Sequence, residues 1–174
     1  MTRRYGRAPR GERVVDAVPE NWGENVTMIG ALGLDGVRAA MHFEGALDGA
    51  VYEVFVTEVL VPQLREGDVV FLDNLSVHKN AAAIEAILAA KATVEFLPPY
   101  SPDLNPIEQL WSKLKALVRG AKARTLEALE HTISAAFAAV TKADAEGWFK
   151  HCGSSLRLEK RAASAPVEPD AALM

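Results

Sequence analysis

Two segments decide the fold: VVFLDN at residues 69–74 and TVEFLPPYSPDLNPIEQLW at residues 93–111. Each begins with a short run of apolar, β-branched and aromatic residues, which favours a strand. Between these runs, residues 77–91 place Ile84, Ile87 and Leu88 on one side of an expected helix. A strand, a helix and a second strand form a βαβ unit, so the two strands are expected to run parallel.

The preceding segments predict an antiparallel hairpin and a helix. Residues 26–32 have the β-branched and apolar content of a buried strand. Residues 37–43 can pair back on them, because Asp35-Gly36 is a strong two-residue turn signal. Asp48 is expected to cap a helix of about 16 residues in which apolar residues recur at helical spacing.

Three further helices are expected after the βαβ unit. Asn105-Pro106 starts the first, with asparagine as the cap and proline at the first helical position, and Gly120 ends it after Arg119. Thr125 caps the next helix, which extends to about Val140. Residues 142–150 form a last short helix.

Length and composition fit one globular domain. The chain has 174 residues, of which 49% are hydrophobic and 24% charged, an ordinary balance for a soluble domain with a core. We expect an α/β domain over residues 1–153, with a mixed sheet flanked by helices, and a flexible tail over residues 154–174. Without a membrane-spanning run or a secretory signal, and with Cys152 as the single cysteine, the expected location is the cytoplasm.

Basic residues gather in two places, although the formal net charge is −4. The first 13 residues contain Arg3, Arg4, Arg7, Arg10 and Arg13. Residues 113–124 contain five basic residues and no acid. Local basic clusters can bind phosphate groups on a mildly acidic protein. A run of charge is equally compatible with a solvated face.

Asp73 follows directly on the first strand of the βαβ unit. Ligands of open α/β sheets gather at the carboxyl ends of the strands. A carboxylate at that position is costly unless it is neutralised, which a divalent cation does well. Asp73 and Asn74 also fit a simple turn or helix cap. His78 and Lys79 fall at the expected helix start, where they are either exposed or close to DNA.

Glu108 lies in the first turn of the helix that Asn105 is expected to cap. Its spacing from Asn105 fits a capping box, so a structural role is open. On a helical wheel, Lys115 and Arg119 fall within roughly 40° of Glu108, as Ser112 does. A separate stripe is expected to face the core, made of Ile107, Leu110, Leu114 and Leu117, with Trp111 packing between the two faces. The polar face suits a metal-bound phosphate, with DNA continuing along the helix.

Residues 70–74 and 97–108, followed by Trp111 and Lys115, resemble the mariner-like DDE transposases of bacterial insertion sequences. The 34 residues between Asp73 and Glu108 match the usual separation of the second and third catalytic carboxylates in that superfamily. The stretch from Tyr100 to Glu108 is the most specific part. The resemblance extends from residues 5–11 to about Gly153.

The resemblance implies an RNase H-like fold that cleaves and transfers DNA strands by two-metal phosphoryl transfer. It makes Asp73 the second catalytic carboxylate and Glu108 the third, holding two Mg²⁺ (or Mn²⁺) ions, which suit carboxylate oxygens. The implied partners are DNA, both transposon ends and target, and a second copy or a full-length transposase, in a nucleoid-associated location. The residues expected to contact DNA are Arg3, Arg4, Arg7, Arg10, Lys79, Lys115 and Arg119.

One part of the family pattern is not found. The family's first aspartate ends a strand upstream of the arginine- and glycine-rich loop seen here at residues 3–13, and none of Asp16, Asp35 and Asp48 follows an apolar strand in that order. Asp35 is expected in a turn and Asp48 at a helix cap. We therefore expect an N-terminally truncated catalytic domain without its first strand, inactive alone. A non-catalytic regulator that binds DNA or a transposase, and a remnant fragment, are the alternatives.

Overall fold

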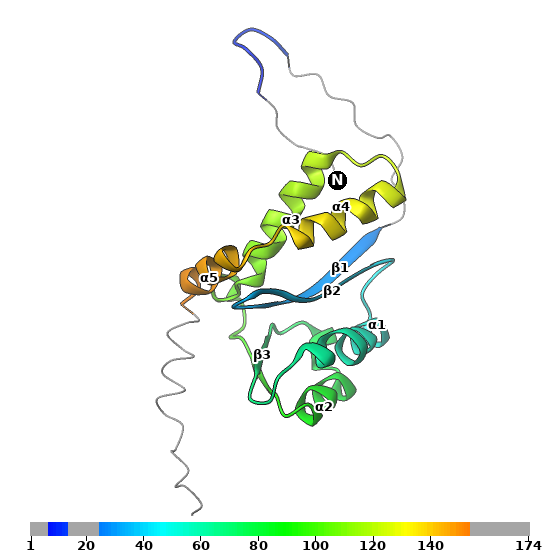
Figure 1. Ribbon diagram of the computed structural model, residues 1–174, viewed down its shortest axis with the longest axis vertical. Coiled ribbons are helices and arrows are strands. Elements are labelled where there is room, and N and C mark those ends of the chain that lie inside the picture. The colour runs from blue at the N-terminus through cyan, green and yellow to red at the C-terminus, as the bar shows by residue number, and fades with distance from the viewer. Residues whose placement is uncertain (1–6, 14–24, 154–174) are drawn as a thin grey trace, which may run out of the picture.

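The computed structural model describes residues 7–13 and 25–153 (Figure 1). The expectations for Arg3, Arg4 and Asp16 and for a flexible tail from residue 154 to 174 lie outside the described residues. Within the described ranges, every helix is too short or too polar to span a lipid bilayer.

The antiparallel hairpin is confirmed. Strand β1 (Val26–Gly33) pairs with β2 (Gly36–Glu44), from Val26 opposite Glu44 to Gly33 opposite Gly36. Asp35 lies in the turn, as expected. Gly36 has φ +126°, a conformation that favours glycine because a side chain is strained there.

The parallel βαβ unit is also confirmed, with a shorter helix than expected. Strands β3 (Val69–Leu72) and β4 (Thr93–Phe96) run parallel on either side of α2 (Ala81–Ala89). Residues Ser76–Lys79 form a separate 3₁₀ turn, η3. Asn80 divides the two because its backbone is extended and its side-chain oxygen accepts the Ala83 N–H at 3.0 Å, which caps α2.

The helix after Asp48 begins as expected and then changes its hydrogen-bonding pattern. Asp48 Oδ1 accepts the Val51 N–H at 2.9 Å. Helix α1 (Gly49–Val54) continues as a π-helical segment, η1 (Phe55–Leu60), and then as a 3₁₀ turn, η2 (Val61–Gln63). Pro62 has no N–H to donate, which is consistent with the helix ending at this point.

A 3₁₀ turn, η4 (Pro102–Leu104), leads into α3 (Ile107–Ala121), which is followed by α4 (Leu126–Ala138) and α5 (Lys142–His151). The prediction that Gly120 ends α3 was wrong. Gly120 is helical, and Lys122 ends the helix with a left-handed backbone at φ +52°. A lysine there is uncommon, so the glycine was the stronger sequence signal.

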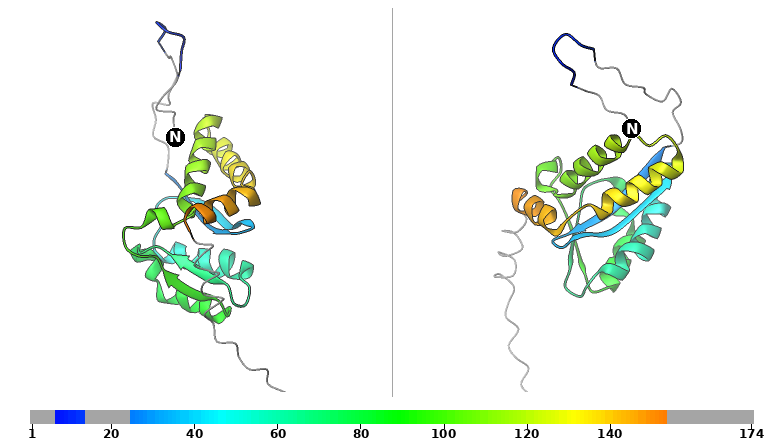
Figure 2. Two further views of the ribbon diagram at one scale, coloured as in Figure 1. Left: turned by 90° about the vertical axis from the view of Figure 1, so that its left-hand side faces the viewer. Right: turned by 45° about the horizontal axis from the view of Figure 1, so that its top comes forward.

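The hairpin lies between two helical layers (Figures 1 and 2). One face packs on α1, η1 and α2, where Ile29 and Ala39 join the buried core. The other face packs on α3 and α4, where Val26 and Met28 lie against the buried cluster that includes Leu110 and Leu114. Alternate residues of β1 thus enter opposite cores, as the pleat of a strand requires. The mixed α/β class is confirmed.

The strands form two pairs rather than one continuous sheet. Within the described residues, hydrogen bonds join β1 to β2 and β3 to β4. The β3–β4 pair is attached through side chains, since Val70 and Val94 pack into the core shared with η1 and α2. Arg38 of β2 adds a polar link, 3.0 Å from Asp68 just before β3.

The apolar stripe of α3 differs from the expected one at its end. Leu110, Leu114 and Val118 are buried, whereas Leu117 is 40% exposed. The expected stripe placed Leu117 in the core. The buried residues of α3 are spaced by four positions, whereas one helical turn takes 3.6 residues. The buried side therefore rotates slowly around the helix and reaches Val118 rather than Leu117 in the last turns.

Candidate active site

Asp73 lies just beyond the carboxyl end of β3, as expected. Its Oδ1 atom accepts two hydrogen bonds, from the Leu75 N–H at 3.0 Å and from the His78 Nδ1 at 2.6 Å. The side chain is 39% exposed. Asp73 therefore does form a local turn, and it also presents its carboxylate to solvent at the strand end.

His78 is directed to Asp73 rather than to solvent. Its side chain is only 18% exposed, which differs from an exposed helix start. The Tyr52 ring of α1 packs on the imidazole, with 4.9 Å between the ring centroids. Burial and the nearby Asp73 charge raise the pKa of Tyr52 to about 12. Sequence reasoning missed this cluster because its three members come from three separate elements.

Asn74 ties the two parallel strands together. Its Nδ2 donates to the Leu97 carbonyl oxygen at 2.5 Å, across the carboxyl ends of β3 and β4. The amide group thus has a structural partner. This bond fixes the start of the loop that leads from β4 to α3.

Glu108 occupies the first turn of α3 and is exposed. The capping-box reading does not hold, because the Asn105 N–H donates to the Pro102 carbonyl oxygen at 3.0 Å. Asn105 instead accepts the Ile107 N–H through its side chain at 3.3 Å. Across the described part of the chain, the Glu108 carboxylate has no hydrogen-bond or ion-pair partner. The helix N-terminus favours its negative charge.

Asp73 and Glu108 are thus both accessible carboxylates, one after β3 and one at the start of α3. No direct interaction joins them within residues 25–153. Nor does the described part of the chain contain a group of three or more His, Cys, Asp or Glu side chains arranged to hold a metal ion. Whether these two carboxylates share a cation site stays a prediction.

The basic residues of α3 divide into two kinds. Lys115 is exposed and Arg119 partly exposed, and neither has an ion-pair partner among the described residues. Ser112 and Glu108 are exposed too, as the helical wheel predicted. Lys113, in contrast, is held by Asp144 of α5 at 2.6 Å. The helix therefore presents a polar face from Glu108 to Arg119.

The other basic residues expected to contact DNA are exposed where the structure describes them. Arg7 and Arg10 flank Pro9, whose carbonyl oxygen accepts the Glu12 N–H at 3.0 Å in a tight turn. Lys79 is exposed in η3, next to His78. Exposure does not test whether these residues contact DNA, so that contact stays a prediction.

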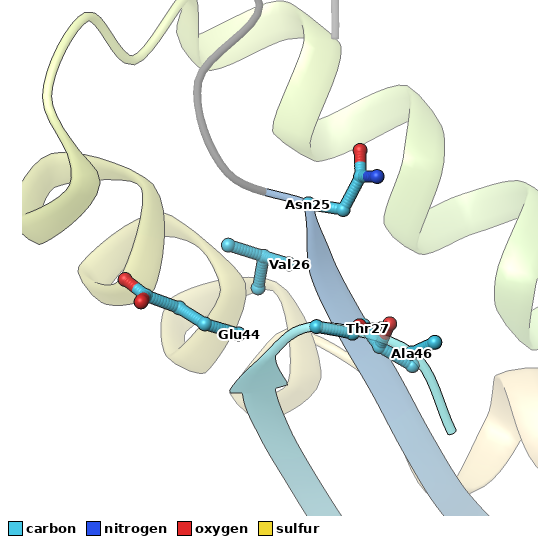
Figure 3. Close-up of a pocket in the computed structure, with 6 residues that line it drawn as sticks. Asn25, Val26, Thr27, Glu44 and Ala46 are labelled. Atoms are coloured by element: carbon cyan, nitrogen blue, oxygen red, sulfur yellow. Dashed lines mark hydrogen bonds between the residues drawn. The ribbon is translucent and has the colours of Figure 1, made fainter. Parts of the chain in front are cut away.

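A pocket of about 790 Å³ lies elsewhere, where β1 begins and β2 ends (Figure 3). It is lined by Asn25, Val26, Thr27, Glu44, Gly45 and Ala46. Neither Asp73 nor Glu108 contributes to it, and its one ionisable side chain is a single glutamate. The pocket is therefore not part of the candidate site.

Comparison with solved structures identifies the same fold in transposases. The Mos1 transposase paired-end complex with left transposon end has a TM-score of 0.66 and 19% identity, with 94% of this chain and 50% of that chain covered. The Mos1 strand transfer complex has a TM-score of 0.62 and 19% identity, with 94% of this chain and 50% of that chain covered. A pre-cleavage Mos1 transpososome has a TM-score of 0.63 and 16% identity, with 94% of this chain and 51% of that chain covered. The chain thus spans about half the length of these transposase chains.

The family assignment comes from the sequence itself. Residues 1–130 match the model of the DDE superfamily endonucleases. The match covers most of the chain, so the chain belongs to that family. No curated protein matches it. Endonucleases of this superfamily generally use divalent metal ions. The RNase H-like fold class and the DDE superfamily predicted from sequence are both confirmed.

Proposed function

We propose that this chain is the catalytic domain of a transposase, which binds DNA and belongs to the machinery that cleaves and transfers DNA strands. The observation that carries the proposal is the position of Asp73 after β3 and of Glu108 at the start of α3, within a chain of the DDE endonuclease family. The Mos1 structures, whose names include a transposon end and strand transfer, support DNA as the substrate.

The residues at the two positions suit a hard divalent cation. Asp73 Oδ2 has no hydrogen-bond partner among the described residues, because both hydrogen bonds of this carboxylate go to Oδ1. Glu108 is exposed and has no partner among the described residues. Carboxylate oxygens are the preferred ligands of Mg²⁺ and Mn²⁺. Two such ions, when bound, would polarise the attacked phosphate and stabilise the leaving oxygen.

The exposed cations offer a route for the DNA. Lys115 and Arg119 continue along α3 from Glu108, on the face opposite the buried leucines. Arg7, Arg10 and Lys79 are exposed as well. Basic side chains that neutralise phosphates supply most of the non-specific affinity for DNA. We propose that DNA lies along the polar face of α3, in the bacterial nucleoid.

Binding of Mn²⁺ and of DNA tests the proposal. We expect Asp73→Asn and Glu108→Gln each to weaken Mn²⁺ binding, measured by the electron paramagnetic resonance signal of free Mn²⁺, with unchanged circular dichroism. Asp68→Asn is the matched control, since Asp68 is held by Arg38 and by the Arg65 N–H. Unchanged Mn²⁺ binding in both site variants would refute the cation site.

The catalytic state of the chain needs a separate measurement. The expectation that the chain alone does not cut DNA stays a prediction. Mg²⁺-dependent cleavage of a duplex by the purified chain, lost in Asp73→Ala, would overturn it. DNA or transposase binding that survives Glu108→Gln, without any cleavage, would favour the alternative of a regulator.

A further inference from the structure

We infer that His78 is a positioning residue for Asp73, which it holds so that only Oδ2 of the carboxylate is directed to the cation. The inference rests on the proposed function, because it concerns the orientation of a carboxylate in the proposed cation site. It follows from the two contacts of Asp73 and from the packing around His78.

The two oxygens of Asp73 differ in their surroundings. Oδ1 accepts the Leu75 N–H at 3.0 Å and lies 2.6 Å from His78 Nδ1. These two donors occupy the lone pairs of Oδ1. Oδ2 accepts no hydrogen bond from the described residues, so it can still bind a cation. A cation would therefore meet Asp73 through one oxygen, with the other held by the protein.

The imidazole packs on a buried ring, and the turn that carries it is bonded to α1. Tyr52, which is buried at 3% exposure, packs its ring on His78. Asn80, two residues after His78, donates through Nδ2 to the Gly49 carbonyl oxygen at 3.0 Å. This bond joins the end of η3 to the start of α1. Helix α1 contributes no ligand of its own but packs on the ring that hydrogen-bonds to Asp73. Ligating carboxylates of metal sites are commonly hydrogen-bonded by such outer-shell groups.

The contact requires a particular tautomer. A carboxylate accepts hydrogen bonds only, so a nitrogen 2.6 Å from Asp73 Oδ1 must carry a proton. His78 therefore carries a proton on Nδ1. Long-range ¹H–¹⁵N correlation spectra of the labelled chain distinguish this form from a neutral imidazole protonated at Nε2 alone, with the His78 signals assigned by their loss in His78→Asn.

Two isosteric substitutions separate the roles of the two ring nitrogens. Asparagine places an amide nitrogen at the distance of Nδ1 from Cβ, whereas glutamine places it at the distance of Nε2. We expect His78→Ala and His78→Gln to raise the Kd for Mn²⁺ by about 10–100-fold, as removal of outer-shell partners does. His78→Asn should keep a Kd close to that of the unchanged chain.

Three further variants test the packing on His78 and provide a control. Tyr52→Phe should preserve Mn²⁺ affinity, because the packing on His78 involves the ring, whereas Tyr52→Leu should weaken it. His131 is exposed on α4, so His131→Ala is the matched control and should leave the Kd unchanged. Rescue by His78→Asn shows that the donor, rather than the bulk of the ring, is what Asp73 needs.

The outcomes separate this inference from the proposed function. If Asp73→Asn abolishes Mn²⁺ binding while His78→Ala leaves it unchanged, the inference is wrong and the cation site stands. A His78 ring protonated at Nε2 alone would also overturn the inference. If Asp73→Asn leaves Mn²⁺ binding unchanged, the proposed cation site itself is wrong.

Discussion

The ammonium group of Lys113 on α3 lies 2.6 Å from Asp144 Oδ2 on α5. The same oxygen accepts the Thr141 N–H at 2.8 Å, and Thr141 Oγ1 accepts the Asp144 N–H at 3.2 Å to complete a capping box. Lys113 also donates to the Ala139 carbonyl oxygen at 3.1 Å. Lys113 therefore joins the α4–α5 connection to α3 and differs from the exposed cations of the same helix.

The Lys113–Asp144 contact predicts a pH dependence of stability. The bond from Lys113, and then those from Thr141, lower the pKa of Asp144 to about 2 from its ordinary 3.8. A lowered pKa stabilises the fold above pH 3.8, and this contribution is lost as the pH falls towards 2. Lys113→Met should lower the urea midpoint at neutral pH, and the difference from the unchanged chain should shrink over that range. A constant difference would contradict the assignment.

Two lysines that are two positions apart on α3 give a matched test of DNA binding. Lys115 is exposed without an ion-pair partner among the described residues, whereas Lys113 is paired with Asp144. Lys115→Ala and Arg119→Ala should each weaken binding to duplex DNA by a similar factor whatever the DNA sequence. Each should also reduce the slope of log K against log[salt] by about 1. Lys113→Ala should leave the slope unchanged. An equal effect of Lys113→Ala and Lys115→Ala would argue against DNA along this face.

Local signals in the sequence determine most of the fold. The Asp35-Gly36 turn, the Asp48 cap and the Thr125 cap act within a few residues, and each lies where it was expected. The errors come from competing local bonds and from packing. Asn80 divides a helix that periodicity alone would continue, and Val118 replaces Leu117 in the core because α3 packs against α4 and the hairpin.

Only part of the candidate site can be derived from the sequence. Asp73 and Glu108 could be selected because each ends or begins an element and because the intervening motif is specific. The contact of His78 with Asp73 depends on the 3₁₀ turn η3, which brings the imidazole back to the strand end. Tyr52, which packs on His78, lies 26 residues before it, in α1. No sequence pattern links these residues, since tertiary packing alone brings Tyr52 to His78.

Trp111 should be important for stability rather than for DNA binding. Its ring packs edge-on against Phe137, with 6.2 Å between centroids, over the core of α3 and α4. Trp111→Ala should lower the free energy of unfolding by about 3–5 kcal/mol, measured by urea denaturation followed by circular dichroism. Trp111→Phe, which keeps an aromatic contact, should cost less. Unchanged stability in Trp111→Ala would refute this packing role.

Gly30 provides the space for the Trp111 ring. A Cβ atom at Gly30 would lie 3.2 Å from the Ala39 carbonyl oxygen and 3.5 Å from Trp111. Overpacking of a close-packed core typically costs about 1–3 kcal/mol. Gly30→Val should therefore destabilise the chain by about that amount and Gly30→Ala by less, in the same urea measurement. Equal stability of both variants and the unchanged chain would show that this face of the hairpin can move away from α3.

Cys152, the single cysteine of the chain, should react slowly with thiol reagents. Its side chain is buried at the end of α5, and burial, followed by the nearby Asp103 charge, raises the pKa of the thiol. A raised pKa leaves less thiolate, which is the reactive form. The rate of disulfide exchange with an aromatic disulfide reagent should therefore be much lower for the folded chain than in urea. Asp103→Asn should increase the folded rate slightly, because it removes only the smaller contribution. Equal rates in the folded and unfolded chain would mean that α5 does not stay packed over this cysteine in solution.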